Sequence, residues 1–288
     1  MKVYVSNYLS NSISILDPEV LEVESEILFE DAIHPHSFYI DNQRNIMYIP
    51  SSITGDLYLW SFEENKIIDT LSIGGNINGL MIHNSEMYLV NEDSNSIYII
   101  DIKTLKPEGI ISVDEMPRGL DIDKINNKLY VPCSETIVKI DTKTKQIEKV
   151  KEIKLKAWSL KLNNDTSEIY VATIEGKILV LDRESLDIKN IIDKCILPIE
   201  MVISNIHNRV YISDIGCKGI IVLDYKTNDV LDTIDVGGYP QGLCLINDDK
   251  YILVSDTQNN IIKIYSTEES KLIKSIKVGK EPTTIACL

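Results

Sequence analysis

The chain has 288 residues, 44% of them hydrophobic, with a formal net charge of −15 at pH 7 and an isoelectric point near 4.7. This charge argues against nucleic acid as a partner, because phosphate binding requires clustered Lys and Arg. No run approaches the roughly 20 apolar residues of a membrane span, and the chain starts without a signal-peptide core, which predicts a cytoplasmic protein that makes no membrane contact.

One pattern recurs from the N-terminus onward: an apolar strand containing Tyr, a polar turn, and a second apolar strand. The copies begin at Lys2, Met47, Met87, Leu129, Ile169, Val210 and Tyr251, and their aligned positions are 40–44 residues apart. Apolar and polar residues alternate with a period of two, which predicts antiparallel hairpins rather than helices. The spacing is that of a four-stranded propeller blade.

A further strand precedes each hairpin and an outer strand follows it, so each unit runs a, b, c, d. The a strands begin at Pro35, Ile77, Pro117, Ala157, Pro198, Pro240 and Pro282. Because the chain begins on a b strand and ends on an a strand, its two ends must pair to complete the last blade.

We therefore expect an all-β, seven-bladed β-propeller of four-stranded antiparallel blades, forming one domain over residues 1–288. The N-terminal strands and the C-terminal strand close the ring. The predicted blades are residues 35–75, 76–115, 116–155, 156–196, 197–238, 239–280, and 281–288 together with 1–34.

The repeats resemble those of the bacterial and archaeal YVTN-repeat (YncE-like) propellers over the whole chain. The matching segments are YVSN at Tyr4, ISILD at Ile13, IIVLD at Ile220, VGGYP at Val236, VSD at Val254 and VGKEP at Val278. The resemblance implies the fold but selects no function, since the family includes surface-layer domains, ligand-binding proteins and relatives of lactonase propellers. Ala157-Trp158 stands where Pro is usual, so a specialised contact is expected there.

The position just after the repeat's Pro differs in every repeat, which is typical of an asymmetric binding face and equally of drift. It holds His36, Asn78, Arg118, Trp158, Ile199, Gln241 and Thr283. Arg118 suits a carboxylate or phosphate, and Trp158 offers a stacking face. Alternatively, Trp158 plugs the channel and Arg118 pairs with Glu200 or another carboxylate. The candidate binding residues are His36, Asn78, Arg118, Trp158, Glu200 and Gln241.

A second set of polar residues ends the b strands: Asn7, Ser51, Asn91, Cys133, Thr173, Asp214 and Asp256. Asp214 and Asp256 fall in neighbouring repeats, so they are candidate ligands for a divalent cation such as calcium, as the likeness to metal-dependent lactonases implies. The alternative is that these side chains start the b–c turns by bonding the backbone.

The five cysteines have no CxxC spacing and an odd count, which predicts reduced thiols rather than a disulfide frame or a zinc site. Cys244 and Cys287 lie on a strands and are expected as small core residues. Cys133 is a candidate nucleophile, although no base is visible beside it in the sequence.

We predict a non-enzymatic binding or scaffold protein whose asymmetric axial face meets an unknown protein or small-molecule ligand. It would carry no resident cofactor. One alternative is a lactonase-like hydrolase that uses acidic axial residues with or without a metal ion. Another is a purely structural repeat protein. No catalytic residue is assigned, because no nucleophile elbow or similar motif occurs.

Overall fold

The alternating segments form 28 strands, and no helix occurs in the described residues, 2–287, of the computed structural model. The strands make seven four-stranded antiparallel sheets, which confirms the predicted all-β class and the seven blades. By contacts the chain divides into two compact units. The first unit contains three segments: the residues up to His36, Gly176–Ile178, and the residues from Ile192 onward. The second unit contains Ser37–Glu175 and Leu179–Ile191.

Three sheets belong to the first unit. Their strands are β28 (Pro282–Cys287), β1 (Val3–Asn7), β2 (Ser12–Asp17) and β3 (Glu22–Leu28); β20 (Pro198–Ser204), β21 (Arg209–Asp214), β22 (Gly219–Asp224) and β23 (Val230–Asp235); and β24 (Pro240–Ile246), β25 (Tyr251–Asp256), β26 (Ile261–Ser266) and β27 (Leu272–Lys277).

The closure predicted between the chain ends is confirmed in this unit. Strand β28 pairs antiparallel with β1, with Cys287 opposite Val3 and Ile285 opposite Val5. Met1 and Leu288, the first and last residues of the chain, belong to the predicted closing blade and lie outside the described residues. The pairing gives both terminal strands a hydrogen-bonded neighbour, so neither presents an open edge on that side.

Four sheets belong to the second unit, apart from the first residue of β18 and the last of β19. Their strands are β4 (Tyr39–Asp41), β5 (Ile46–Pro50), β6 (Asp56–Ser61) and β7 (Lys66–Ser72); β8 (Ile77–His83), β9 (Glu86–Asn91), β10 (Ser96–Asp101) and β11 (Pro107–Ser112); β12 (Asp121–Asp123), β13 (Lys128–Pro132), β14 (Thr136–Asp141) and β15 (Gln146–Glu152); and β16 (Ala157–Asn163), β17 (Glu168–Thr173), β18 (Ile178–Asp182) and β19 (Ile188–Ile192).

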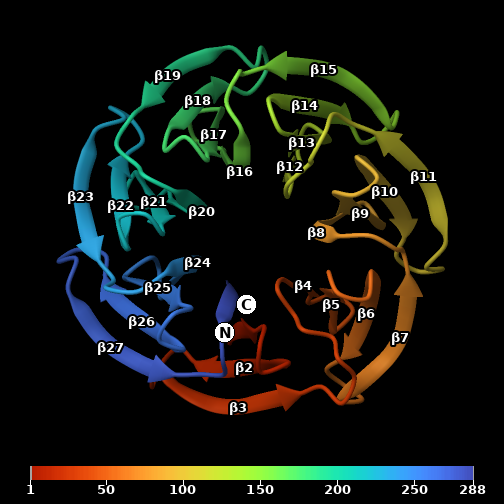
Figure 1. Cartoon of the computed structure of the whole chain (residues 1–288), viewed down its shortest axis with the longest axis horizontal. Coiled ribbons are helices and arrows are strands. Elements are labelled where there is room, and N and C mark those ends of the chain that lie inside the picture. The colour runs from red at the N-terminus through yellow and green to blue at the C-terminus, as the bar shows by residue number, and fades with distance from the viewer. Residues whose placement is uncertain (1, 288) are drawn as a thin grey trace. The chain divides into compact units, whose positions relative to one another are not determined.

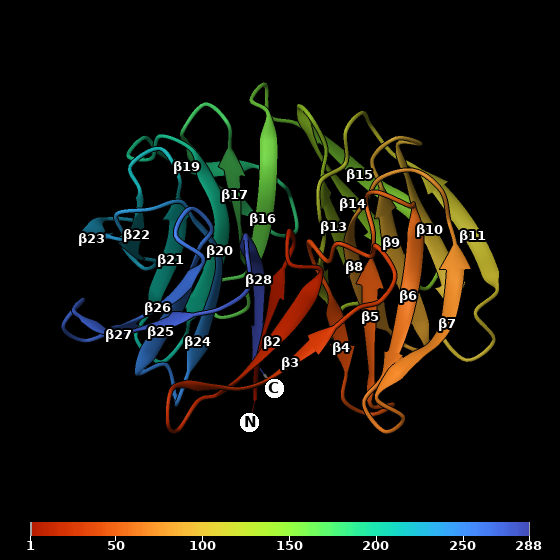
Figure 2. The same ribbon diagram turned by 60° about the horizontal axis from the view of Figure 1, so that its bottom comes forward.

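Within six of the blades the four strands follow one another in chain order, as β8 to β11 do in Figure 1 and as β5, β6 and β7 do in Figure 2, whereas β28 precedes β1 in the closing blade. Two a strands are shorter than the sequence predicts. Strand β12 starts only at Asp121, because Gly119 has a φ of +71°, a left-handed conformation that interrupts extended pairing after Pro117. Strand β4 likewise starts at Tyr39.

The core lies between neighbouring blades. In one cluster Tyr88, Val90 and Ile97 pack against Leu129 and Val131 of the next blade. The b and c strands are therefore almost wholly buried, whereas the outer d strands keep exposed residues. Each blade buries a face that it cannot bury alone, which is why the repeat must be iterated to fold.

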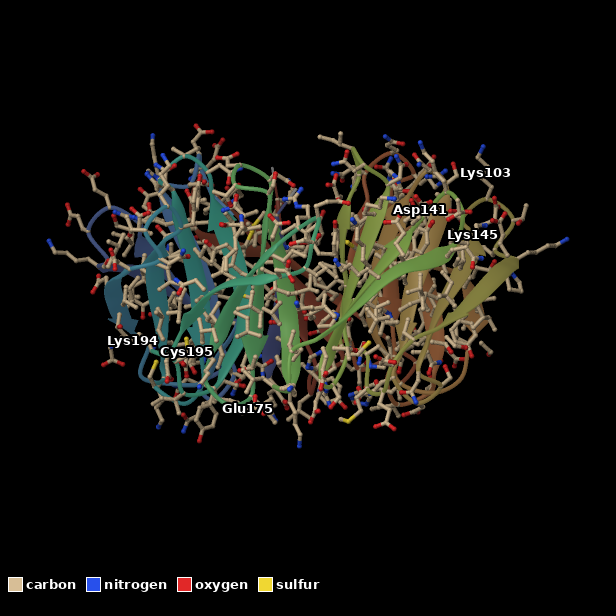
Figure 3. The ribbon with its side chains drawn as sticks, turned by 90° about the horizontal axis from the view of Figure 1, so that it is seen from above. Lys103, Asp141, Lys145, Glu175, Lys194 and Cys195 are labelled. Atoms are coloured by element: carbon tan, nitrogen blue, oxygen red, sulfur yellow. A yellow bond between two sulfur atoms is a disulfide. The ribbon has the colours of Figure 1, made fainter. Side chains whose placement is uncertain are left out.

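Each blade has two ends, which are named here by their turns. The a–b end carries the turns that join strand a to b and strand c to d, and Asp141 and Lys145 in Figure 3 flank one such c–d turn. The b–c end carries the b–c turns and the segments that enter each a strand. No helix in the described part of the chain is long and apolar enough to cross a membrane.

The prediction of five reduced thiols is wrong for one pair. Cys244 on β24 and Cys287 on β28 form a disulfide, with their Cα atoms 6.6 Å apart, within the range that a disulfide bridges. The two a strands come from consecutive repeats, and the fold brings them together across 43 residues of sequence. Cys133, Cys195 and Cys217 are free.

Candidate functional site

Three of the six predicted binding residues come together at the b–c end of the second unit. Asn78 lies on β8, Arg118 just before β12, and Trp158 on β16. The other three, His36, Glu200 and Gln241, belong to the first unit and are described separately below.

Glu92, a residue that the sequence prediction did not include in the binding set, organises the cluster in the second unit. Its Oε2 accepts hydrogen bonds from Asn78 Nδ2 at 2.8 Å and Asn76 Nδ2 at 3.1 Å, and its Oε1 accepts one from Arg118 Nη2 at 2.9 Å. Arg118 therefore does pair with a carboxylate, as one alternative predicted, and that carboxylate is Glu92. The signal in the sequence was the Glu92-Asp93 pair directly after a b strand.

Arg118 also stacks on Trp158, with its guanidinium carbon 4.3 Å from the ring centroid. The pair combines ion pairing on one edge of the guanidinium with a cation–π contact on its face. The Arg118 side chain stays 26% exposed and that of Glu92 15% exposed. Since guanidinium has five N–H donors and one of them bonds Glu92, the group retains donors for a partner.

In the first unit, His36 contacts residues from two other segments of the chain. Its carbonyl accepts hydrogen bonds from Thr283 Oγ1 at 2.7 Å and Thr284 Oγ1 at 3.0 Å, while its ring packs edge-on against Tyr8. Gln241 is half-buried on β24, and Glu200 is exposed on β20.

Asp214 and Asp256, the predicted metal ligands, are completely buried and accept hydrogen bonds from the protein. Asp214 Oδ2 accepts the N–H of Ile196 at 2.6 Å, and Oδ1 accepts that of Leu197 at 3.0 Å. Asp256 Oδ2 pairs with Lys263 Nζ at 3.1 Å. Such contacts are typical of turn-forming carboxylates. Among residues 2–287, no group of three or more His, Cys, Asp or Glu side chains is placed to hold a metal ion, and a cation at Asp214 and Asp256 stays a prediction.

Cys133 is fully buried at the start of its b–c turn. Burial raises the pKa of its thiol to about 12, so the thiolate that a nucleophile requires is disfavoured at neutral pH. Its burial among apolar residues of two blades explains its presence as a small core residue.

Exposed apolar side chains gather at the same end of the blades. In the second unit they are Ile53, Met116 and Ile174, of which Met116 is 45% exposed two residues before Arg118. In the first unit they are Leu9, Ile196 and Tyr239. Each lies in a b–c turn or in a segment that enters an a strand, and each stays at least 39% exposed, outside the core.

Two cavities lie at the opposite, a–b end, one in each unit. That of the second unit has a volume of about 510 Å³ and includes Arg44, His83 and Lys124 in its lining. That of the first unit has about 450 Å³ and includes His207, Arg209 and Lys250. The sequence prediction missed both, although basic residues in the turns of an acidic chain gave a signal.

No protein-family model matches the chain. Its sequence is 30% identical over 213 residues to the antigen Lp49 of Leptospira interrogans, which covers 69% of this chain and 44% of that protein. It is 25% identical over 190 residues to the uncharacterized protein YncE of Salmonella typhi, covering 62% of this chain and 53% of that protein. The chain thus spans about half the length of these curated relatives.

A solved structure, of a functionally unknown protein from Desulfotomaculum acetoxidans, matches the fold with a TM-score of 0.82. The match covers 99% of this chain and 98% of that chain at 12% identity, so it bears on the fold alone. The YncE matches and the seven four-stranded blades together support a YncE-like seven-bladed β-propeller.

Proposed function

We propose that this propeller is a non-enzymatic binding protein that docks a protein partner at the b–c end of its second unit. The observation that carries the proposal is the Arg118 guanidinium, held between the ring of Trp158 and the carboxylate of Glu92 while a quarter of its side chain stays exposed. An arginine fixed in this way loses little conformational freedom when it binds.

The surroundings of this pair suit a protein surface. Met116, Ile53 and Ile174 expose apolar area at the same end of three blades of this unit. Arg, Trp and Met are enriched at protein interfaces, and Arg and Trp dominate their binding energy. We infer that the partner supplies a carboxylate to the free edge of Arg118 and an apolar side chain to Met116.

The test is a quantitative pull-down from a lysate of the source cell, followed by titration of the captured protein. Arg118→Ala and Trp158→Ala should each weaken binding about 30-fold, as expected for anchor residues. The control variants Lys143→Ala and Ile125→Ala change exposed residues at the a–b end and should bind normally. Thermal melts verify that each variant is folded. Unchanged capture by both folded anchor variants contradicts the proposal.

A further inference from the structure

The cavity of about 510 Å³ in the second unit is built at the a–b ends of three successive blades. Its wall comes from Tyr39 to Arg44 of one blade, from Ile82 to Ser85 and Ile102 of the next, and from Lys124 of the third. The volume lies within the range of pockets that enclose a small metabolite. It lies far along each blade from the Arg118–Trp158 pair, because it occupies the other end of the strands.

The cavity lining carries more positive than negative charge, in a protein whose net charge is −15. Arg44 and Lys124 are the two fixed cations, and Asp41 is the carboxylate. Arg44 Nη1 donates to Asp41 Oδ2 at 2.7 Å, which orients the guanidinium and leaves further N–H donors. Lys124 is exposed, and no carboxylate in the described residues pairs with its ammonium group.

Uncharged polar groups complete the lining. Asn42, Gln43 and Asn84 contribute amides, and Ser85 contributes a hydroxyl. His83 is held in place, with its Nε2 3.0 Å from Asn127 Oδ1. Amides both donate and accept, which suits hydroxyl groups on a ligand.

A hydrogen bond that joins neighbouring blades elsewhere is missing at this cavity. Tyr130 Oη donates to the carbonyl of Arg183 at 3.2 Å. Tyr88 Oη donates to Glu86 Oε2 at 2.5 Å and also lies 3.4 Å from the carbonyl of Thr142. Arg183 and Thr142 each directly follow the Asp that ends the c strand of the next blade. The matching acceptor for Tyr48 is Ile102, which lines the cavity.

Tyr48 makes no such bond. The residue is fully buried, and its hydroxyl has no hydrogen-bond partner among residues 2–287. Tyr48 pairs directly with Tyr39 across β4 and β5, and Tyr39, Asp41 and Arg44 of the lining are its electrostatic neighbours. A buried polar group without a partner calls for a specific explanation, and here Tyr48 packs in the same core cluster as Ile102 of the cavity lining.

We propose that this cavity binds a small, hydroxyl-rich anion of the sugar phosphate or sugar acid class. Its phosphate or carboxylate lies between Arg44 and Lys124, where charge-assisted hydrogen bonds are strongest. Its hydroxyl groups meet the amides of Asn42, Gln43 and Asn84. This site is independent of the docking surface around Arg118.

The test is calorimetric titration of the full chain with glucose 6-phosphate, gluconate, inorganic phosphate and glucose. Glucose 6-phosphate or gluconate should bind at least about tenfold more tightly than glucose and than inorganic phosphate, and the two anions distinguish a phosphate from a carboxylate site. Lys124→Gln should weaken that binding about tenfold. Lys143→Gln, a charge-matched change of an exposed turn lysine outside the cavity, should leave it unchanged.

Three results would overturn this proposal. They are the absence of binding by either anion at about 10 mM, equal affinity for glucose and its phosphate, and a Lys124→Gln variant that binds as well as the parent. Arg118→Ala should bind the anion normally, so that failure here and failure of the docking surface are separate outcomes.

Discussion

The contrast between Tyr130 and Tyr48 gives a matched test of how the blades are joined. Both tyrosines occupy the same position of a b strand and both are buried. Tyr130 Oη donates to the carbonyl of Arg183 at 3.2 Å, whereas Tyr48 Oη has no hydrogen-bond partner in the part of the chain that the structure describes. Replacing each by Phe removes only the hydroxyl, so the two variants isolate the hydrogen bond from the packing of the ring.

The two substitutions are expected to change the free energy of unfolding by different amounts. Tyr130→Phe leaves a buried carbonyl without its partner and should lower the free energy of unfolding by about 1–2 kcal/mol. Tyr48→Phe removes a hydroxyl that is desolvated without compensation, so it should leave the free energy of unfolding unchanged or raise it by about 1 kcal/mol. Burial likewise raises the pKa of Tyr48 to about 12, as expected for a desolvated phenol.

Urea unfolding followed by tryptophan fluorescence measures both variants against the parent. The midpoint should fall for Tyr130→Phe and stay or rise for Tyr48→Phe, with the slope unchanged in each. Equal destabilisation by the two substitutions would refute the reasoning, because it would mean that the Tyr48 hydroxyl is bonded as well as that of Tyr130.

Other predictions concern charge, covalent linkage and metal. Lys128 and the backbone N–H of Thr144 hold the pKa of Asp141 at about 2, so its stabilising effect, present above the unfolded pKa of about 3.9, is lost as the pH falls toward 2. Asp141→Asn should flatten the fall in melting temperature over that window, and an unaltered fall would contradict this. Alkylation of the unfolded, unreduced protein should label three of the five cysteines, and reduction should lower the free energy of unfolding by about 4 kcal/mol, the chain-entropy value for a 43-residue separation; five labelled cysteines would exclude the Cys244–Cys287 bond. Calcium should raise the melting temperature if Asp214 and Asp256 bind it, and this rise should vanish in Asp214→Asn; no rise with calcium, magnesium, manganese or zinc would remove the metal hypothesis.

Much of the fold was predictable because its information is local and repeated. Alternation with a period of two defines each strand, and short polar turns such as that after Asp141 set the register of the hairpins. Seven copies of one pattern fix the number of blades. The pairing of β1 with β28 followed from the phase of the repeats at the two ends of the chain.

The candidate site was predictable only in part. The variable position after the repeat's Pro identified Arg118 and Trp158, but Glu92, which pairs with Arg118, comes from a different loop, 26 residues before it. Side-chain pairs of this kind depend on how neighbouring blades pack, and the repeat pattern does not encode which rotamers meet.

The sequence by itself determined the strand pattern, the number of repeats and their closure, because hydrogen-bonded hairpins depend on residues close together in the chain. Tertiary structure alone decided three features: the disulfide of Cys244 and Cys287, the burial of Asp214 and Asp256 in turns, and the cavity beside the unpartnered hydroxyl of Tyr48. The disulfide and the cavity arise where segments from different blades meet, so their formation depends on packing between elements that no local pattern describes.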